Sequence, residues 1–159
     1  MRLPDETLPW HIDVRPFHNS EKISLDLCRL LPRRALVGPV AVVCDRPVIL
    51  LSVIKKRWSK IIREVEKQCS STLEPLKKEG LKRELSHVTN CRFTSDPLKP
   101  ADIRFTSTEQ ILAHAYDTIC LASRVATDDL ARLLTSLHPL GLLVAYHDWD
   151  ETYENALYN

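Results

Sequence analysis

Three short apolar runs rich in Val, Ile and Leu constrain the fold of this chain more than any other feature. They are LVGPVAVVC at 36–44, TICLA at 118–122 and LLVAY at 142–146. None shows the apolar-polar alternation of a strand that exposes one face to water. Near-continuous apolar runs of this kind are typical of strands buried on both faces, as in a parallel sheet.

Segments with helical periodicity separate these runs. After the first run, an apolar stripe at helical spacing predicts one long helix that reaches about Gln68. Pro75 fits the first turn of a second helix, and Thr127, followed by two aspartates, predicts the start of another. Strands that alternate with helices favour right-handed crossovers and a mostly parallel sheet.

The tetrapeptide Arg-Phe-Thr-Ser occurs at 92–95 and again at 104–107. We interpret the two copies as the ends of two separate strands, His87 to Ser95 and Asp102 to Thr106. The second strand leads into a capping-box pattern, Thr106-Ser107-Thr108-Glu109, which predicts a helix to about Ala115. The alternative is an antiparallel hairpin over 88–107.

The chain ends flank this pattern. Residues 1–35 are expected to form an N-terminal extension with a short strand near 11–15 and a helix that begins at Ser20 and ends at Pro32. Residues 147–159 form an acidic, aromatic tail. We therefore predict one three-layer Rossmann-like α/β domain over 1–159 with a mostly parallel sheet. The alternative is an α+β fold that contains the hairpin at 88–107.

Charge and cysteine content exclude several classes of protein. Lys and Arg total 22 and Asp and Glu total 21, which argues against a protein built mainly to coat nucleic acid or an anionic membrane. No apolar run has the length of a membrane span, and the N-terminus lacks the pattern of a signal peptide, so we expect a cytoplasmic protein. Five cysteines without C-x-x-C spacing indicate neither a disulfide framework nor a zinc site.

Glycine is scarce, and this bears on phosphate binding. The chain has three Gly against ten Pro, and it contains neither G-x-G-x-x-G nor G-x-x-x-x-G-K. Both common phosphate loops depend on glycine backbone, so neither is present. The sequence does not identify a cofactor.

Polar side chains follow every predicted strand. In an open parallel sheet, ligands bind beyond the carboxyl ends of the strands, near the point where strand order reverses. The candidate ligand-binding residues at these ends are Asp45, Arg46, Ser95, Asp96, Ser123, Arg124 and His147. The alternative is that these residues belong to ordinary loops and helix caps.

Two of these candidates are arginines that closely follow buried strands. Arg46 and Arg124 could bind a nucleotide-like anion between them, because guanidinium groups make bidentate contacts with phosphate and carboxylate. The alternative is that they form surface ion pairs with Asp45 and Asp128.

The strand-end carboxylates indicate a different chemistry. Asp45, Asp148 and Asp150 could hold Mg²⁺ or Mn²⁺ for phosphodiester cleavage, with His147 as a base or a ligand. In this respect the chain resembles compact α/β metal nucleases, which place an Asp at the end of the first strand. It departs from them after 118–122, where Ser-Arg stands instead of a second acid.

The stretch YDTICLAS followed by HPLGLLVAYHD resembles two late strands of a class I methyltransferase. The resemblance covers under a third of the chain and implies a Rossmann-like fold. The Gly-rich cofactor loop of that family is replaced by CDRPVI, so the resemblance implies a relative that has lost the cofactor.

Two further segments are candidates for partner binding. The basic helical region 55–83 interleaves cations with glutamates, which usually forms a solvated helix face but could also follow a nucleic-acid backbone. The tail aromatics Trp149, Tyr153 and Tyr158 favour a protein partner or a second copy of the chain. No membrane association is expected.

These observations favour a non-catalytic binding or regulatory module on a Rossmann-like scaffold, which recognises a nucleotide-like anion or a protein partner. The alternative is a metal-dependent phosphodiesterase or nuclease that uses the strand-end aspartates.

Overall fold

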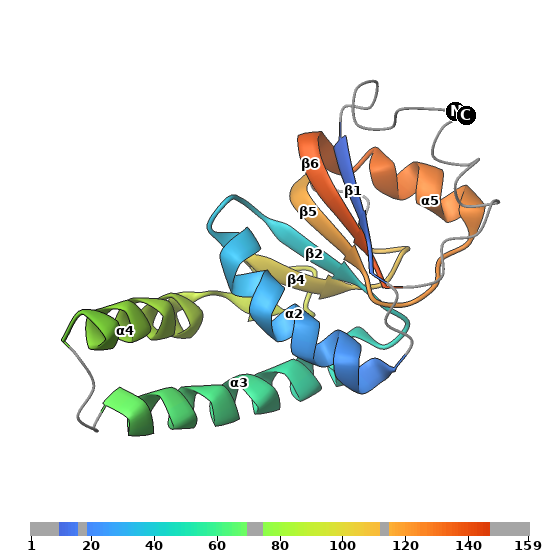
Figure 1. Cartoon of the computed structure of the whole chain (residues 1–159). Helices are drawn as coiled ribbons and strands as arrows, with labels where there is room; N and C mark the ends of the chain where they lie inside the picture. Colours follow the sequence, from blue (N-terminus) through green and yellow to red (C-terminus); the bar gives the residue numbers. More distant parts are fainter. Residues whose placement is uncertain (1–9, 16–18, 70–74, 112–114, 147–159) are drawn as a thin grey trace.

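A six-stranded sheet in which every neighbouring pair is parallel forms the centre of the computed structural model (Figure 1). The structure describes residues 10–15, 19–69, 75–111 and 115–146. The strands are β1 (Trp10–Val14), β2 (Val40–Val43), β3 (Phe93–Thr94), β4 (Ile103–Thr106), β5 (Tyr116–Leu121) and β6 (Leu137–Ala145), in the order β1-β6-β5-β2-β4-β3.

Helices cover both faces of this sheet and give three layers. The helices α2 (Ser20–Ala35) and α3 (Pro47–Cys69) lie on one face, and α5 (Thr127–Leu134) lies on the other (Figure 1). The side chains of β2 alternate between the two layers. Val40 and Val42 pack toward α2 and α3, whereas Ala41 and Val43 pack toward α5. The predicted Rossmann-like α/β fold is confirmed.

The alternative antiparallel hairpin at 88–107 is wrong, because β3 and β4 are parallel neighbours. A parallel pair needs a connection that returns the chain to the start of the sheet. Here that connection contains no helix and is held by Arg104, a buried side chain of β4. Its guanidinium donates hydrogen bonds of 2.7 Å to the carbonyl oxygens of Asp96 and Lys99.

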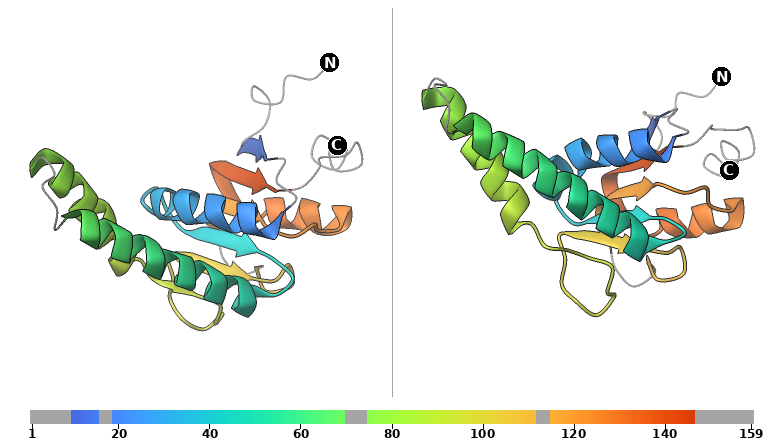
Figure 2. Two further views of the ribbon diagram at one scale, coloured as in Figure 1. Left: turned by 60° about the horizontal axis from the view of Figure 1, so that its bottom comes forward. Right: turned by 90° about the horizontal axis from the view of Figure 1, so that it is seen from below.

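The long helix α3 and the helix α4 (Pro75–Asn90) form a hairpin that projects away from the sheet (Figure 2). The core residues of α3 are Leu51, Ile54 and Trp58, all in its first half. No described residue of α4 is buried. The outer half of this hairpin therefore contributes little to the core.

Pro32 does not end α2 as expected, because the helix continues to Ala35. A proline inside a helix removes the hydrogen bond to the carbonyl four residues earlier, which is that of Cys28. The indole Nε1–H of Trp58 donates to this Cys28 oxygen at 3.2 Å. A donor from α3 thus replaces the bond that Pro32 cannot make.

Two other predicted elements differ from the structure. The segment His87–Asn90 is the last turn of α4 and not the start of a strand. Nε2 of His87 lies 2.6 Å from the Pro32 carbonyl oxygen, a contact between α4 and α2. The capping-box segment after β4 forms a turn that leads to a short 3-10 segment at Ile111. Within the described residues, the helix predicted to reach Ala115 is therefore absent as an α-helix.

Candidate functional site

The strand order reverses at β2, which lies between β4 and β5. From β2 the chain passes to β3 and β4 on one side, and it then crosses to β5 and β6 on the other. The carboxyl ends of β2 and β5 are therefore the place where an open parallel sheet presents a crevice to a ligand.

A cleft of about 590 Å³ lies at this position. Its walls come from the loops that follow β2 and β5 and from the first turns of α2 and α3. The volume falls within the range of small-molecule sites. Four segments that are far apart in the sequence thus meet around one concavity.

The loop after β2 is fixed by hydrogen bonds from its backbone amides to the end of β4 and to a side chain in the loop after β5. The amide of Cys44 donates to the Thr106 carbonyl oxygen at 3.1 Å, and the amide of Asp45 donates to Oγ of Ser123 at 3.2 Å. Arg46 begins the next helix, because its carbonyl accepts from the amide of Leu50 at 3.1 Å. Asp45, Arg46 and Ser123, predicted as separate strand ends, therefore line one cleft.

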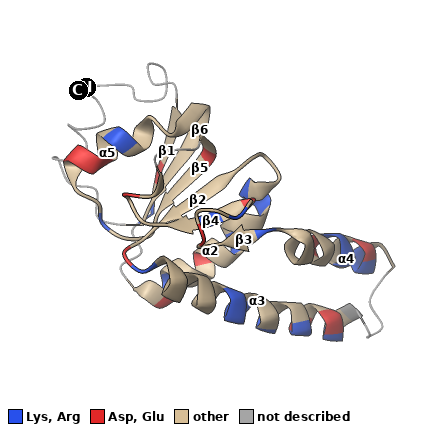
Figure 3. Ribbon diagram, turned by 180° about the vertical axis from the view of Figure 1, so that it is seen from behind, with Lys and Arg blue, Asp and Glu red and all other residues tan. Residues whose placement is uncertain are grey.

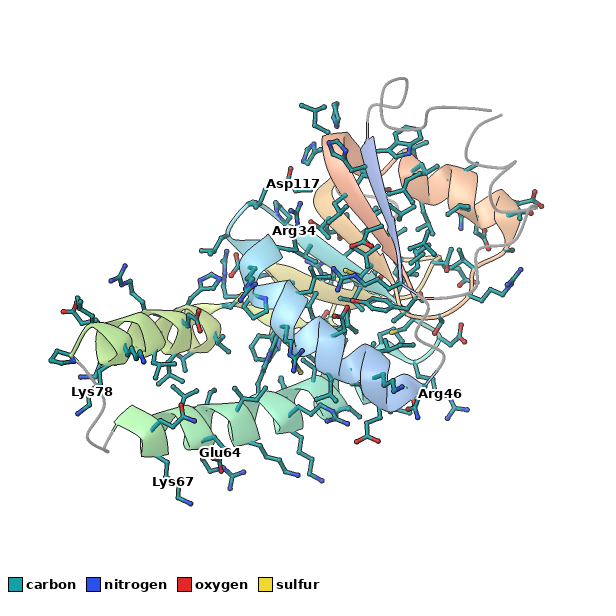
Figure 4. All side chains as sticks on the ribbon, viewed as in Figure 1. Arg34, Arg46, Glu64, Lys67, Lys78 and Asp117 are labelled. Atoms are coloured by element: carbon teal, nitrogen blue, oxygen red, sulfur yellow. The ribbon has the colours of Figure 1, made fainter. Side chains whose placement is uncertain are left out.

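Pro47 explains why the helix starts at once after this loop. Its ring fixes φ near the helical value, and its missing N–H costs nothing in the first turn. Arg46 consequently stands at the amino end of a 23-residue helix, and Lys67 lies near the other end of that helix (Figure 4). The first turn of α3 contains no acidic residue.

One wall of the cleft is apolar. It is formed by Ile23, Ile49, Leu50, Val53 and Ala122. Ile49 and Val53 are 54% and 37% exposed, so this wall presents apolar surface to the open cleft. Such a wall suits the apolar body of a ligand more than a bare inorganic ion.

Arg57 adds a second guanidinium to the cleft. It lies 3.7 Å from Glu21 of α2, and its Nε is buried without a hydrogen-bond partner among the described residues. From the sequence, Arg57 is expected only as part of the basic helical region 55–83. Its spacing from Arg46, at i+11 through Leu50 and Val53, was the signal that it shares their face of the helix.

The candidates Ser95 and Asp96 lie elsewhere. They line a second cleft of about 610 Å³ beyond the end of β3, together with Lys55 and Arg92. Asp96 accepts a hydrogen bond of 3.0 Å from the amide of Leu98, the geometry of an Asx-turn. The edge position of β3, outside β4, separates these two residues from the first cleft.

The Arg92 side chain in this second cleft is engaged by Asp102. Their side chains form an ion pair of 3.2 Å, and the backbone amide of Arg92 also donates to Asp102 at 2.8 Å. These hydrogen bonds from Arg92 lower the pKa of Asp102 below its usual value. The pair anchors the start of β3 to the start of β4 and leaves Arg92 a structural role.

The remaining predicted residues are not brought into either cleft by the part of the chain that the structure describes. Arg124 is exposed beside Ser123 and has an interaction of its own. His147, Asp148 and Asp150 lie outside the described residues. Across the described ranges, no three His, Cys, Asp or Glu side chains are grouped to hold a metal ion. The predicted metal site therefore stays a prediction.

Cys44 is the thiol of the first cleft, and burial sets its chemistry. Burial raises its pKa to about 11, and a weaker backbone hydrogen bond at Arg46 opposes this effect. The thiol is therefore protonated at neutral pH. A thiolate is the nucleophilic form of cysteine, so this environment does not activate Cys44.

No protein-family model matches the chain, and no curated protein matches its sequence. Among the helices that the structure describes, none combines the length and apolar composition needed to cross a membrane.

Proposed function

We propose that this protein is a non-catalytic binding module and that the cleft at the end of β2 and β5 binds a nucleotide-like anion. The observation that carries the proposal is the convergence of Arg46, Ser123 and the amino end of α3 beside an apolar wall. The fold supplies the scaffold, and this site supplies the recognition.

The amino end of α3 suits the anionic part of the ligand. The amides of Val48 and Ile49 lie in the first turn, where N–H groups have no acceptor within the helix. The dipole of a 23-residue helix adds partial positive charge at this end. Arg46 contributes a full positive charge that can make bidentate contacts with phosphate.

The apolar wall suits the remainder of the ligand. Ile49 and Val53 offer a surface on which a base or a sugar can pack, and the Ser123 hydroxyl can orient a polar edge. The buried Nε–H of Arg57 is a donor in need of an acceptor, which a bound anion would provide.

Two observations favour binding without turnover. The cleft thiol of Cys44 is protonated at neutral pH, and the loop after β2 carries Arg46 and Pro47 where phosphate-processing loops use glycine. A regulatory role would follow if the bound nucleotide changes the affinity for a protein partner.

Isothermal titration calorimetry with AMP and with adenosine tests the proposal. AMP is expected to bind at least tenfold more tightly than adenosine, because only AMP carries the anion. Arg46→Ala is expected to weaken AMP binding about tenfold or more, the scale of a charge-assisted hydrogen bond. Arg29→Ala, an exposed cation of α2 that does not line the cleft, is the matched control. Absence of AMP binding at about 10 mM, or equal loss in both variants, would refute the proposal.

A further inference from the structure

The outer half of the α3–α4 hairpin has no described buried residue. Packing in the core therefore does not explain why the chain extends the two helices this far. Beyond Trp58, the apolar residues Ile62 and Val65 are only half-buried, and so are Leu81 and Leu85 of α4. These four positions continue the inward-facing stripes of the two helices, which lie side by side (Figure 2). Their partial burial accompanies the contact between α3 and α4.

The hairpin carries a charge opposite to that of the rest of the chain. Residues 47–90 contain ten Lys and Arg and five Glu, a net charge of +5. The remaining residues contain 12 Lys and Arg and 16 Asp and Glu, a net charge of −4. The near-neutral total therefore conceals a strong asymmetry, of the kind associated with nucleic-acid or membrane contact. Figure 3 shows Lys and Arg recurring along α3.

Four of these cations form one line along α3. Lys56, Lys60, Arg63 and Lys67 are spaced i, i+4, i+7 and i+11, and all four are exposed. With 3.6 residues per turn, they lie on the side opposite Trp58 and Val65. Figure 4 shows Lys67 on the outer side of α3, pointing away from α4. We call these four residues the basic stripe.

The basic stripe has a composition that suits a polyanion. Successive members of the stripe place positive charges about one turn apart along one side of the helix, which is the arrangement that a polyanion favours. The two glutamates of this segment, Glu64 and Glu66, fall on the flanks of the stripe by the same helical geometry. The stripe spans about 16 Å along the axis, at 1.5 Å per residue.

We infer that the basic stripe binds the phosphodiester backbone of a nucleic acid. A protein partner fits it less well, because the stripe contains no apolar residue and interface cores are depleted in Lys. Backbone contacts by flexible cations carry no base recognition, so the binding is independent of sequence. This surface is separate from the cleft that holds Arg46.

The salt dependence of binding tests the number of contacts. Fluorescence anisotropy with a labelled 20-base-pair DNA duplex should give a slope of log K against log[salt] near −3.6 for four phosphate contacts. That slope corresponds to about 150-fold weaker binding when salt rises from 50 to 200 mM. A single-stranded 20-mer should give a slope near −2.8, or about 50-fold over the same range.

The decisive variant replaces the stripe by glutamine, K56Q/K60Q/R63Q/K67Q. Glutamine has a helix propensity close to that of lysine, so the fold should persist, which circular dichroism would check. For this stripe variant, the slope of log K against log[salt] is expected near zero, and binding at 50 mM salt should be at least about 30-fold weaker. The matched control, K22Q/R29Q/R33Q/R132Q, removes four exposed cations from α2 and α5 and should leave the slope unchanged.

Three outcomes would overturn the inference. The first is no duplex or single-strand binding at 50 mM salt, and the second is an equal loss of affinity in the stripe variant and the control. The third is equal affinity for polyglutamate of the same charge, which would assign the stripe to an acidic protein partner instead.

Discussion

The indole Nε1–H of Trp58 donates to the carbonyl oxygen of Cys28, the acceptor that Pro32 leaves unpaired within α2. Trp58 and Cys28 are both buried, with 4% and 5% exposure. One hydrogen bond therefore joins α2 to α3 and allows a helix to continue through a proline.

This arrangement predicts a coupling between positions 58 and 32. Trp58→Phe should lower the free energy of unfolding by about 1–3 kcal/mol, because it leaves the buried Cys28 carbonyl without this donor. The smaller side chain causes a further loss from packing. In a Pro32→Ala background the cost should be smaller, because the alanine introduced there can supply the missing N–H to the Cys28 carbonyl. Urea unfolding of the four proteins in a double-mutant cycle measures this coupling. An equal cost of Trp58→Phe in both backgrounds would contradict it.

Pro32 also shows a feature of the fold, the end of α2, that could not be predicted from the sequence. Its effect on α2 depends on a donor that lies 30 positions beyond Cys28 in the chain, which local rules cannot supply. The strand VAVV of β2 could be predicted because burial on both faces leaves a continuous apolar run. Asp45, Arg46 and Ser123 could be predicted as ligand candidates because parallel strands end at one edge.

Other parts of the site depend on tertiary placement. Arg57 and Glu21 reach the cleft only because α2 and α3 lie together on one face of the sheet. Ser95 and Asp96 fall outside it because β4, and not β3, pairs with β2. Both facts depend on strand order, which the alternation of strands and helices does not determine.

The carboxylate of Asp26 connects α2 to two strand ends. Its Oδ2 accepts from the phenol of Tyr146 at 2.6 Å and also from the guanidinium of Arg15. Tyr146 is fully buried, and its pKa is raised by burial above the ordinary tyrosine value, so it remains a donor at any physiological pH. Asp26→Ala should lower the unfolding free energy by about 2–4 kcal/mol, because it removes a charged acceptor shared by the buried phenol and by Arg15.

Tyr146→Phe is the comparison for this cluster. It removes only one donor and leaves the Arg15–Asp26 pair, so the expected loss is about 1 kcal/mol. Chemical denaturation of both variants gives the ranking. A Tyr146→Phe variant as unstable as Asp26→Ala would show that Arg15 contributes nothing through Asp26.

Gly38 precedes β2 and is packed against Asp117 of β5 (Figure 4 labels Asp117). A Cβ at position 38 would lie 1.5 Å from Oδ2 of Asp117, so Gly38→Ala forces that carboxylate to move. The expected destabilisation is about 1–3 kcal/mol. Asp117→Ala in the same background should recover most of it, although the Asp117 Cβ stays close at 3.1 Å. Thermal denaturation of the unmodified protein and the two variants measures this recovery. If stability is not recovered, the strain lies elsewhere than at Asp117.

Ser123 tests the architecture of the proposed binding cleft. Its Oγ accepts from the amide of Asp45 in an exposed position, so Ser123→Ala should change stability by less than about 1 kcal/mol. AMP binding should nevertheless weaken severalfold, because the loop that carries Arg46 loses this contact to the end of β5. Calorimetric titration against Thr135→Ala, which alters a hydroxyl just beyond α5, provides the control. Unchanged AMP affinity would separate Ser123 from ligand binding.

Cys120 predicts how stability changes at alkaline pH. Its side chain is fully buried in β5, and burial raises its pKa to about 12 from 9.0. Above pH 9 the unfolded chain releases this proton while the folded chain retains it, so the unfolding free energy falls as pH rises. One such thiol contributes a decline of about 1.4 kcal/mol per pH unit between these two pKa values. Cys120→Ala should be less stable at pH 7 but should show a shallower decline between pH 9 and 11, measured by urea unfolding at each pH. Parallel profiles for the two proteins would contradict a thiol kept protonated by burial, since only the ionisation of Cys120 differs between them.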